Sequence, residues 1–576
     1  MRSLMLARIL GVLGLAAAVS LGGACAKATP AGSTTTSSAP VTKPAATSVA
    51  PTTARPSVAT TSVPAPAAPT GPYGNLRIAV ASFDIETLNP VTGGASEGLQ
   101  MVSPIVDSLL RLDGTKLAPG VADSWEMATD GLSWTFRVHK GIKFQDGSDL
   151  TAADVKFSFE QYMAKDAGQS YLRNGLARVE VVDNYTVRAY TKGIQVFLPY
   201  YLSFYYPAMG WVLPKSYIEK NGIDYFKKNP MGSGPFKFSR YAPGDFIEYQ
   251  ALDKHWRQVP AFRTLTQMLI PEEATRVAML KTGTAEIIDS GLESGRELKQ
   301  AGFRTVNLVY AQSCILLWGA YVPESAALPM GNIKFRQALS YAINRDEIKN
   351  TVFYGEASPP LPGFLVPEAV DIDAAYWADQ SAKVYNRYDP EESKRLLKEI
   401  GYPEKFASPT VKLYSYTASG APYLPKLIEI SASYLAKVGI KTEIIPTTWS
   451  AVTVDTNTLK STRLVGAAGG MKVSGRASAP EILNTWVGTS GSKTMLQKAF
   501  PDVEKTIAAA AGETDAAKRK AMIAQVAKTI SDAYVSIQFG GVPSVAGLGP
   551  GVDLMPMPVT ELPVYAESVK HRPATK

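Results

Sequence analysis

Hydrophobic and polar residues alternate in several short segments of the chain. Residues 75–82 (NLRIAVAS) and 535–541 (VSIQFGG) show the two-residue period of a strand. In residues 132–144 (LSWTFRVHKGIKF) the alternation runs on both sides of Gly141 and puts three large apolar side chains on one face. We therefore predict two strands and a hairpin from these segments.

Other segments repeat their apolar residues every three or four positions, as helices do. Residues 151–164 begin on a threonine cap, and residues 389–403 begin on Asp-Pro and stop at Gly401. Residues 334–353 predict one continuous helix, residues 515–534 an amphipathic helix, and residues 426–446 a helix followed by a strand. Strands and helices are mixed along the chain, which predicts an α/β fold.

The N-terminal segment has a different texture. A 13-residue apolar run, residues 9–21, follows Arg2 and Arg8 and has the length expected of the apolar region of an export signal. It ends in LGGAC, which resembles the site at which a cysteine, here Cys25, is lipidated. Leu21 lies four residues before this cysteine instead of the usual three, so ordinary cleavage nearby is the alternative.

The next segment cannot form a hydrophobic core. Residues 26–72 consist almost wholly of Ala, Thr, Ser, Pro and Val, a composition typical of extended, solvated linkers. We predict that residues 1–25 are a lipoprotein signal peptide and that residues 26–72 are a disordered tether.

Charge and composition exclude several classes of function. The formal charge is +8, but the first 72 residues hold five basic and no acidic side chains, so the rest of the 576-residue chain carries only +3. This nearly balanced surface does not favour nucleic-acid binding. Two cysteines and three scattered histidines predict neither a disulfide framework nor a metal site, and we expect no cofactor.

Five motifs then occur in an order typical of one family. Residues 117–160 contain DGLSWTFRVHKGIKFQDGSDLTAADVKFSFE, residues 229–256 contain NPMGSGPFKF, and residues 335–348 read FRQALSYAINRDEI. Residues 388–403 (YDPEESKRLLKEIGYP) and 513–526 (ETDAAKRKAMIAQV) complete the set. The chain resembles the extracellular family 5 solute-binding proteins of ABC importers, which take peptides, nickel and related solutes.

The resemblance implies a fold and an organisation. The fold is the two-lobed periplasmic-binding-protein type II (class C) architecture with an inserted subdomain. Lobe I would comprise residues 73–115, 231–312 and 531–576, the inserted subdomain residues 116–230, and lobe II residues 313–530.

The resemblance also implies a non-enzymatic function. The chain would be a monomer on the outer face of the cytoplasmic membrane, in the periplasm or at the cell surface, held there by a lipid anchor. It would capture a small solute or peptide by lobe closure and deliver it to the permease subunits of an ABC transporter.

Candidate ligand contacts lie in three segments at the expected lobe boundary. The first, residues 92–98, holds Ser96 and Glu97, and the second, residues 313–321, holds Trp318. The third is residues 463–480 (RLVGAAGGMKVSGRASAP), which we expect to be a bare, slightly basic loop. Its candidate contacts are Gly470, Met471, Lys472 and Arg476.

The third segment lacks a feature of peptide-binding relatives, where an acid at this place pairs with the ammonium group of the peptide. Here Lys472 and Arg476 have the opposite charge. One interpretation is that the protein prefers a neutral, anionic or apolar solute over free peptide amino-termini. A second is that the acid comes from elsewhere, for example from Glu97 or Asp84. A third is that the segment is a mobile surface loop.

Two other patterns have alternative interpretations. Residues 94–98 (GASEG) match the nucleophile motif of α/β-hydrolases, so an exported hydrolase with Ser96 as nucleophile is the rival function. The aromatic run of residues 197–211 (FLPYYLSFYYPAMGW) could stack on a sugar or apolar ligand, or it could form the core of the inserted subdomain.

Overall fold

The computed structural model describes one compact unit of the chain, which begins at residue 68. The described residues are 71–83, 86–92, 100–114, 116–204, 208–367, 369–418, 420–448, 451–452, 462–473, 478–487, 499–554 and 565–573. The predicted signal peptide and tether lie outside these ranges.

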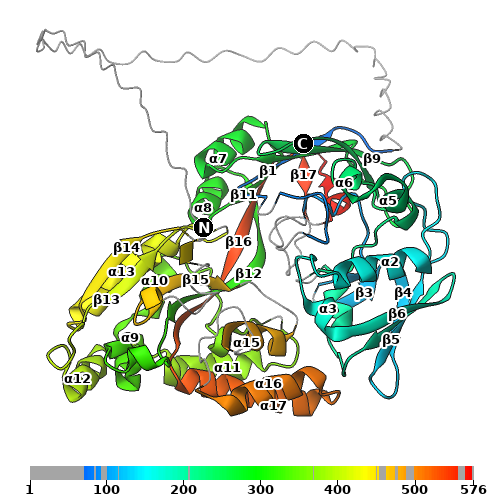
Figure 1. The fold of residues 1–576 in the computed structure, drawn as a ribbon. Helices are drawn as coiled ribbons and strands as arrows, with labels where there is room; N and C mark the ends of the chain where they lie inside the picture. The colour runs from blue at the N-terminus through cyan, green and yellow to red at the C-terminus, as the bar shows by residue number, and fades with distance from the viewer. Residues whose placement is uncertain are drawn as a thin grey trace, which may run out of the picture. The chain divides into compact units, whose positions relative to one another are not determined.

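A ten-stranded mixed sheet runs through this unit (Figure 1). Its strands, in spatial order, are β14 (Thr442–Pro446), β13 (Val411–Ser415), β15 (Ala468–Val473), β12 (Arg304–Leu317), β16 (Ser536–Leu548), β11 (Ile287–Ser290), β1 (Asn75–Val80), β10 (Thr264–Leu269), β9 (Phe246–Ala251) and β8 (Phe236–Ala242). The two long central strands, β12 and β16, are antiparallel. The predicted strands at residues 75–82 and 535–541 are confirmed as β1 and the first half of β16.

A second sheet has four antiparallel strands: β4 (Ala122–Met127), β5 (Ser133–Val138), β7 (Thr186–Thr191) and β6 (Leu176–Asp183). The hairpin predicted at residues 132–144 is wrong. β5 pairs with β4 and β7, whereas residues 142–144 form only an isolated bridge between Lys143 and Asp149. Gly141 does turn the chain, with φ at 86°. The three residues after it, 142–144, are too few to form a ladder with β5.

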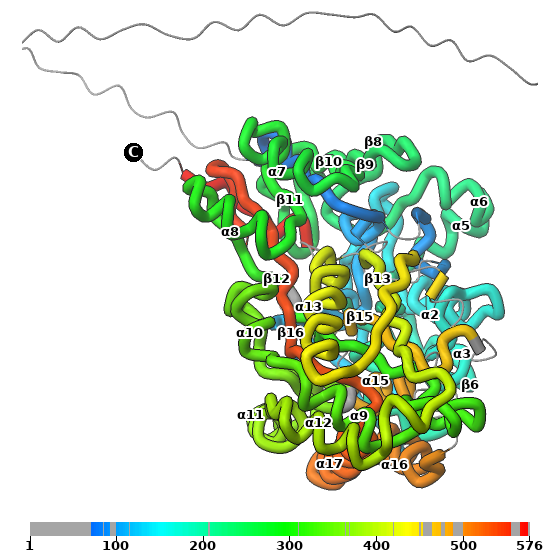
Figure 2. The backbone as a smooth tube through the Cα atoms, turned by 90° about the vertical axis from the view of Figure 1, so that its left-hand side faces the viewer, coloured from blue at the N-terminus to red at the C-terminus, as the bar shows by residue number. Residues whose placement is uncertain are grey.

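Helices cover both sheets. They are α2 (Ala152–Met163), α3 (Tyr171–Gly175), α4 (Leu198–Tyr201), α5 (Lys215–Asn221), α6 (Ile223–Phe226), α7 (Glu273–Thr282), α8 (Leu292–Gln300), α9 (Ile333–Ala342), α10 (Arg345–Thr351), α11 (Ala374–Gln380), α12 (Pro390–Ile400), α13 (Leu424–Lys437), α15 (Ala479–Val487), α16 (Pro501–Gly512) and α17 (Ala516–Asp532). In Figure 2, α13 lies against β13 and β15, and α16 and α17 lie side by side.

Local capping explains which helix predictions are confirmed. The Asp154 carboxylate accepts from the backbone N–H of Thr151 at 2.9 Å and fixes the start of α2. Asp389 caps α12 through Glu392 N–H at 2.9 Å. The single helix predicted at residues 334–353 is instead two helices, because Asn344 leaves the helical conformation and caps α10 with its side chain.

Two large hydrophobic cores form around the large sheet, and a third, small cluster joins β1, β11, α7 and α8. We call core A the cluster that gathers residues from Leu76 to Leu308 together with the tail from Ala546 to Val569, and core B the cluster from Cys314 to Val542. The four-stranded sheet packs into core A. β12 and β16 contribute residues to both cores, so the transition between cores lies inside these two strands. The lobe limits drawn from the sequence stay a prediction.

The segment at residues 463–480 is not a bare loop. Residues 468–473 form β15, which pairs with β12 from Leu317 to Gln312 and is buried except at Lys472. The sequence could not show this strand because its glycine and alanine residues have low strand propensity, and its pairing partner lies far away in the chain.

A buried charge network fastens the C-terminal tail to core A. Asp107 is 3% exposed and accepts from Trp256 Nε1 at 2.9 Å, Arg257 at 2.9 Å and Ser233 Oγ at 3.1 Å. Arg257 also pairs with Glu567 of the tail at 2.7 Å. Burial alone would raise the pKa of Asp107, but its contacts with His255 and Arg257 outweigh burial and hold this pKa well below its usual value.

We predict that Asp107→Asn lowers the free energy of unfolding by about 3 kcal/mol at pH 7, because Arg257 then lacks one of its buried charge partners. The native pKa of Asp107 lies below its unfolded value of about 3.9, so its stabilisation is present above that pH and is lost as the pH falls. The stability difference from wild type should therefore shrink between about pH 5 and pH 2.

Urea unfolding followed by tryptophan fluorescence over this pH range measures the effect. Asp113→Asn, at an exposed end of β2 (Leu110–Asp113), is the matched control and should change stability little. A difference between Asp107→Asn and wild type that stays constant with pH would contradict the assignment.

Candidate ligand-binding site

The carboxyl ends of several parallel strands meet where core A gives way to core B. β1 is parallel to β10 and β11, and β13 is parallel to β14 and β15. In α/β sheets, ligands bind in crevices outside such strand ends. A cavity of about 450 Å³ lies here, lined by Ala81, Ser82, Pro271, Glu272, Glu273, Arg276, Asp289, Ser290, Gly291, Leu292, Thr417, Ala418, Gly420, Pro422, Tyr423, Pro543 and Ser544.

Arg276 of α7 organises the wall of this cavity that β10 and β11 form. The residue is only 4% exposed, and its guanidinium donates to the backbone carbonyls of Ile270, Pro271 and Asp289 at 2.7 to 2.8 Å. These carbonyls lie at the ends of β10 and β11. Arg276 therefore ties together the strand ends that carry the cavity, and its charge is neutralised mainly by peptide dipoles.

Three carboxylates line the same wall. Glu273 accepts from Gly291 N–H at 2.7 Å and so fixes the loop before α8. Asp289, half-buried at the end of β11, accepts from Ala81 N–H at 3.4 Å, and Glu272 is exposed. With three carboxylates and one guanidinium among the lining side chains, the cavity has an acidic character.

Core B supplies the opposite wall through the loop between β13 and α13. Gly291 approaches this loop so closely that a Cβ atom on it would lie 3.3 Å from Pro422 Cγ and 3.2 Å from a Glu273 oxygen. Tyr423 is held by an edge-to-face contact with Phe353, with ring centroids 5.1 Å apart. Both walls are therefore preorganised by contacts that do not involve a ligand.

The structure leaves several predicted site residues untested. Cys25, Asp84, Ser96, Glu97 and Arg476 lie outside the described residues, and their roles stay predictions. The hydrolase motif at residues 94–98 lies outside them as well.

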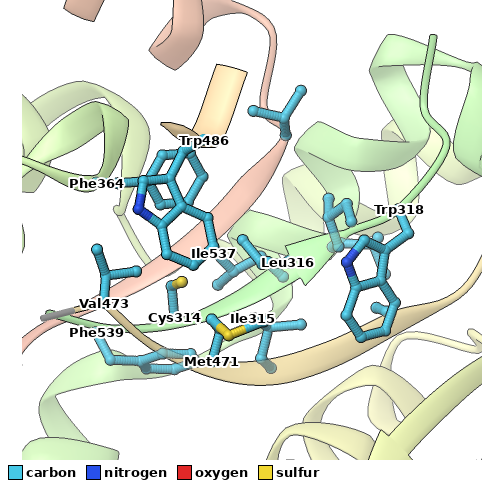
Figure 3. Packing of buried hydrophobic residues seen from close by; sticks show 14 of the residues in the cluster. Cys314, Ile315, Leu316, Trp318, Phe364, Met471, Val473, Trp486, Ile537 and Phe539 are labelled. Atoms are coloured by element: carbon cyan, nitrogen blue, oxygen red, sulfur yellow. The ribbon is translucent and has the colours of Figure 1, made fainter. Parts of the chain in front are cut away.

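Three of the described candidates belong to core B. Trp318 is 4% exposed, and its ring makes an edge contact with Tyr414 at 6.0 Å. Met471 is 1% exposed and lies beside Cys314 on the paired strands, as Figure 3 shows. Gly470 faces Leu424 and Ile428 of α13. None of these residues lines the cavity described above.

Lys472 is placed differently. It is half-buried, and because side chains alternate along a strand it points to the same face of the sheet as Gly470, the face that α13 covers. The loop that precedes α13 lines the cavity. Lys472 thus shares a face of the sheet with the helix whose preceding loop lines the cavity, but it is not itself a lining residue.

The described part of the aromatic run at residues 197–211 is mostly core. Phe204 and Trp211 are 6% and 1% exposed and meet edge to face at 4.4 Å. Cys314 is completely buried, and burial raises the pKa of its thiol far above the usual value, so it is not a nucleophile.

The sequence analysis missed the cavity carboxylates. Glu272 and Glu273 follow the end of β10 by three and four residues, in LIPEE, and Asp289 is the third residue of β11, in IIDSG. Polar residues directly after short apolar runs were the available signal, but the parallel pairing that brings β10 and β11 to one edge is visible only in three dimensions.

Metal-binding clusters and membrane-spanning helices are absent from the described residues. These residues include no cluster of three or more His, Cys, Asp or Glu side chains suited to a metal ion. Within the same residues, no helix combines the length and apolar character that a membrane crossing requires.

Solved structures share this fold. The ABC transporter substrate-binding protein CtaP from Listeria monocytogenes matches with a TM-score of 0.74 at 19% identity, covering 87% of this chain and 99% of that one. The oligopeptide-binding protein AppA from Bacillus subtilis, solved with a nonapeptide, matches with a TM-score of 0.69 at 19% identity, covering 87% of this chain and 99% of its own. The α/β architecture expected from the resemblance is confirmed.

Sequence comparison agrees with the fold. A glutathione-binding protein, GsiB, from Salmonella paratyphi A is 28% identical over 373 residues, which cover 64% of this chain and 68% of the relative. The family of bacterial extracellular solute-binding proteins, family 5, matches residues 116–493. This is a family of binding proteins and not of enzymes, so the hydrolase alternative loses its support. The chain belongs to the family 5 extracellular solute-binding proteins of ABC transporters.

Proposed function

We propose that this protein captures a small solute in the cavity between cores A and B and presents it to the permease subunits of an ABC importer. Closure of the two lobes around the solute would give the form that the permease recognises. The solute would shift the population toward this closed form only by the amount by which it binds the closed form more tightly than the open form.

The cavity is the observation that carries this proposal. A volume of about 450 Å³ lies within the range of about 300 to 1,000 Å³ typical of small-molecule sites. It has room for a solute of the size of a di- or tripeptide. Its walls come from both cores, so a bound solute would contact both sides at once.

We propose that the solute is not recognised through a carboxylate on β15. Residues 468–476 read AGGMKVSGR and contain no acid, and Lys472 is half-buried on the face of β15 that α13 covers. A solute with an anionic or neutral group facing this strand fits that charge. Ser96, Glu97 and Arg476 remain proposed contacts of the same cleft, whereas Trp318, Gly470 and Met471 pack in core B and do not line it.

A peptide with a free amino-terminus is the second candidate, and the acidic wall favours it. Asp289, Glu272 and Glu273 line the cavity and could hold an ammonium group there. This acid source differs from Glu97 and Asp84, which the sequence suggested. One relative is a glutathione-binding protein and a structure of the same fold was solved with a nonapeptide, so both glutathione and short peptides are suitable probes.

The two candidates predict different responses to amine blocking. Calorimetric titration with an unmodified dipeptide, its N-acetylated form and glutathione measures the difference. We expect acetylation to change affinity less than three-fold if the amino-terminus is not read. Tight binding of the free dipeptide with a ten-fold or larger loss on acetylation, about 1.4 kcal/mol, would establish the second candidate.

Blocking the cavity should remove whatever solute the protein retains. Thr417 is exposed in the cavity lining, and Thr417→Trp would place an indole in the space that the solute uses. Native mass spectrometry of gently purified protein should show a retained solute in wild type and at least a ten-fold lower occupancy in the variant. Thr351→Trp, at an exposed position of α10, is the matched control and should retain the solute. Equal occupancy in both variants would place the solute elsewhere.

We also propose that Cys25 carries a lipid anchor and that residues 26–72 tether the binding domain to the outer face of the membrane. The support is the apolar run that ends in LGGAC and the core-less linker that follows. Cys25→Ser should move the protein from the membrane fraction to the soluble fraction, as measured by immunoblotting after ultracentrifugation. A wild-type protein that is already soluble would rule out the anchor.

A further inference from the structure

A second contact joins the two halves of the structure outside the cavity lining. After β7, residues 194–200 leave the four-stranded sheet and approach the helices of core B. A Cβ atom on Gly512, the last residue of α16, would lie 3.7 Å from Ile194 Cβ. Phe197 lies against Arg519 of α17, with the guanidinium carbon 5.5 Å from the ring centroid. α16 and α17 are the orange helices in Figure 1.

Phe197 is buried in an unusual way. Its side chain is only 3% exposed, yet it belongs to none of the three hydrophobic clusters among the described residues, whereas its neighbour Leu198 is part of core A. Its ring lies against the guanidinium of Arg519 and, with centroids 6.3 Å apart, beside the ring of Tyr200. The core B half therefore contributes to the burial of this ring.

The partner surface on core B is a buried ion pair. Arg519 and Asp371 form a salt bridge in which their side chains are only 7% and 8% exposed. Arg519 also donates to the backbone carbonyl of Glu513 at 2.7 Å, which fixes the guanidinium at the turn between α16 and α17. A guanidinium fixed in this way presents a flat, weakly hydrated face on which an aromatic ring can stack.

Tyr200 of α4 also lies within the electrostatic reach of this ion pair. Burial raises the pKa of its hydroxyl, and the negative charge of Asp371 raises it further while Arg519 acts in the opposite direction. A tyrosine of α4 thus senses both members of the ion pair, which belongs to the other half of the chain.

We propose that residues 194–200, docked on Gly512, Arg519 and Asp371, form a latch that holds the two lobes closed. The inference rests on the proposed function, since it concerns the closure of that same binding protein. Opening would expose the Phe197 ring to water and rehydrate the Arg519 side chain, so the latch favours the closed form. Because it lies apart from the cavity lining, it sets the closed population without contacting the solute.

The latch can be tested by cross-linking. The 3.7 Å separation at Ile194 and Gly512 fits the Cβ–Cβ distance of a disulfide, about 3.5 to 4.5 Å. The double variant Ile194→Cys and Gly512→Cys, made in the full chain with Cys25→Ser, should therefore form a disulfide rapidly under mild oxidation. Cys314 is buried with a raised thiol pKa and should not compete. Non-reducing gel mobility measures the rate.

Phe197→Ala in this background should slow cross-linking at least five-fold, because the closed form loses its latch contact. Leu198→Ala is the matched control: it is equally buried but packs into core A, so it should lower stability without slowing the cross-link. Failure of the cysteines to cross-link, or equal rates in the two alanine variants, would overturn the latch.

This experiment needs no added solute, so its result is separate from that of the proposed function. A Phe197-dependent cross-link supports the latch even if every binding titration is negative. Conversely, a solute retained in the cavity with no effect of Phe197 on cross-linking overturns the latch and leaves the proposed function standing.

Discussion

The antiparallel pairing of β12 with β16 is the constraint on which the rest of the structure depends. These two strands contribute to both cores, so their hydrogen-bond ladder holds core A and core B in one sheet. The ladder is irregular between Asn307 and Tyr310 and between Ser313 and Cys314, which brackets the transition between the cores. Irregular pairing of this kind increases local twist and bending, so the two halves meet where the central strands are bent.

The same crossing explains the glycines of β16. Gly540 has φ at 105°, and a Cβ atom there would lie 1.9 Å from the carbonyl oxygen of Ser358. Gly541 donates its N–H to Ser358 Oγ at 3.1 Å. A side chain at Gly540 would push the 358 loop away from the strand, so this position requires glycine. β11 pairs with β16 only at residues 545–548. At Gly541, the loop that contains Ser358 takes the place of this neighbouring strand.

Buried arginines repeat one structural solution in the family motifs. Arg336 and Arg345, both in FRQALSYAINRDEI, donate mainly to backbone carbonyls, including Ala533 at 3.0 Å and Gln538 at 2.8 Å near β16. Arg276 does the same at the cavity wall. The motifs that reveal the family therefore secure strand ends and helix ends. These motifs identify the scaffold. The carboxylates that line the cavity, Glu272, Glu273 and Asp289, lie outside the motifs.

Features that depend on interactions between residues close in sequence could be predicted, and features that depend on distant residues could not. The ends of α2 and α12 depend on caps within three residues, and they were predicted correctly. The prediction of one continuous helix at residues 334–353 was wrong. It followed the helical period of the apolar residues and overlooked Asn344, which caps the second helix. β15 and the cavity carboxylates depend on pairing between distant strands, which no local pattern reveals.

The small residues of β15 show why this matters for function. A Cβ atom on Gly469 would lie 2.4 Å from Cη2 of Trp318, and one on Gly470 would lie 3.1 Å from Leu424. Packing thus forbids a large side chain at either position, whatever the ligand is. The absence of an acid at Gly469 and Gly470 follows from the core and says little about the solute. Glu272, Glu273 and Asp289 line the cavity and lie outside this packing, so a proposal about the charge of the solute rests better on them than on β15.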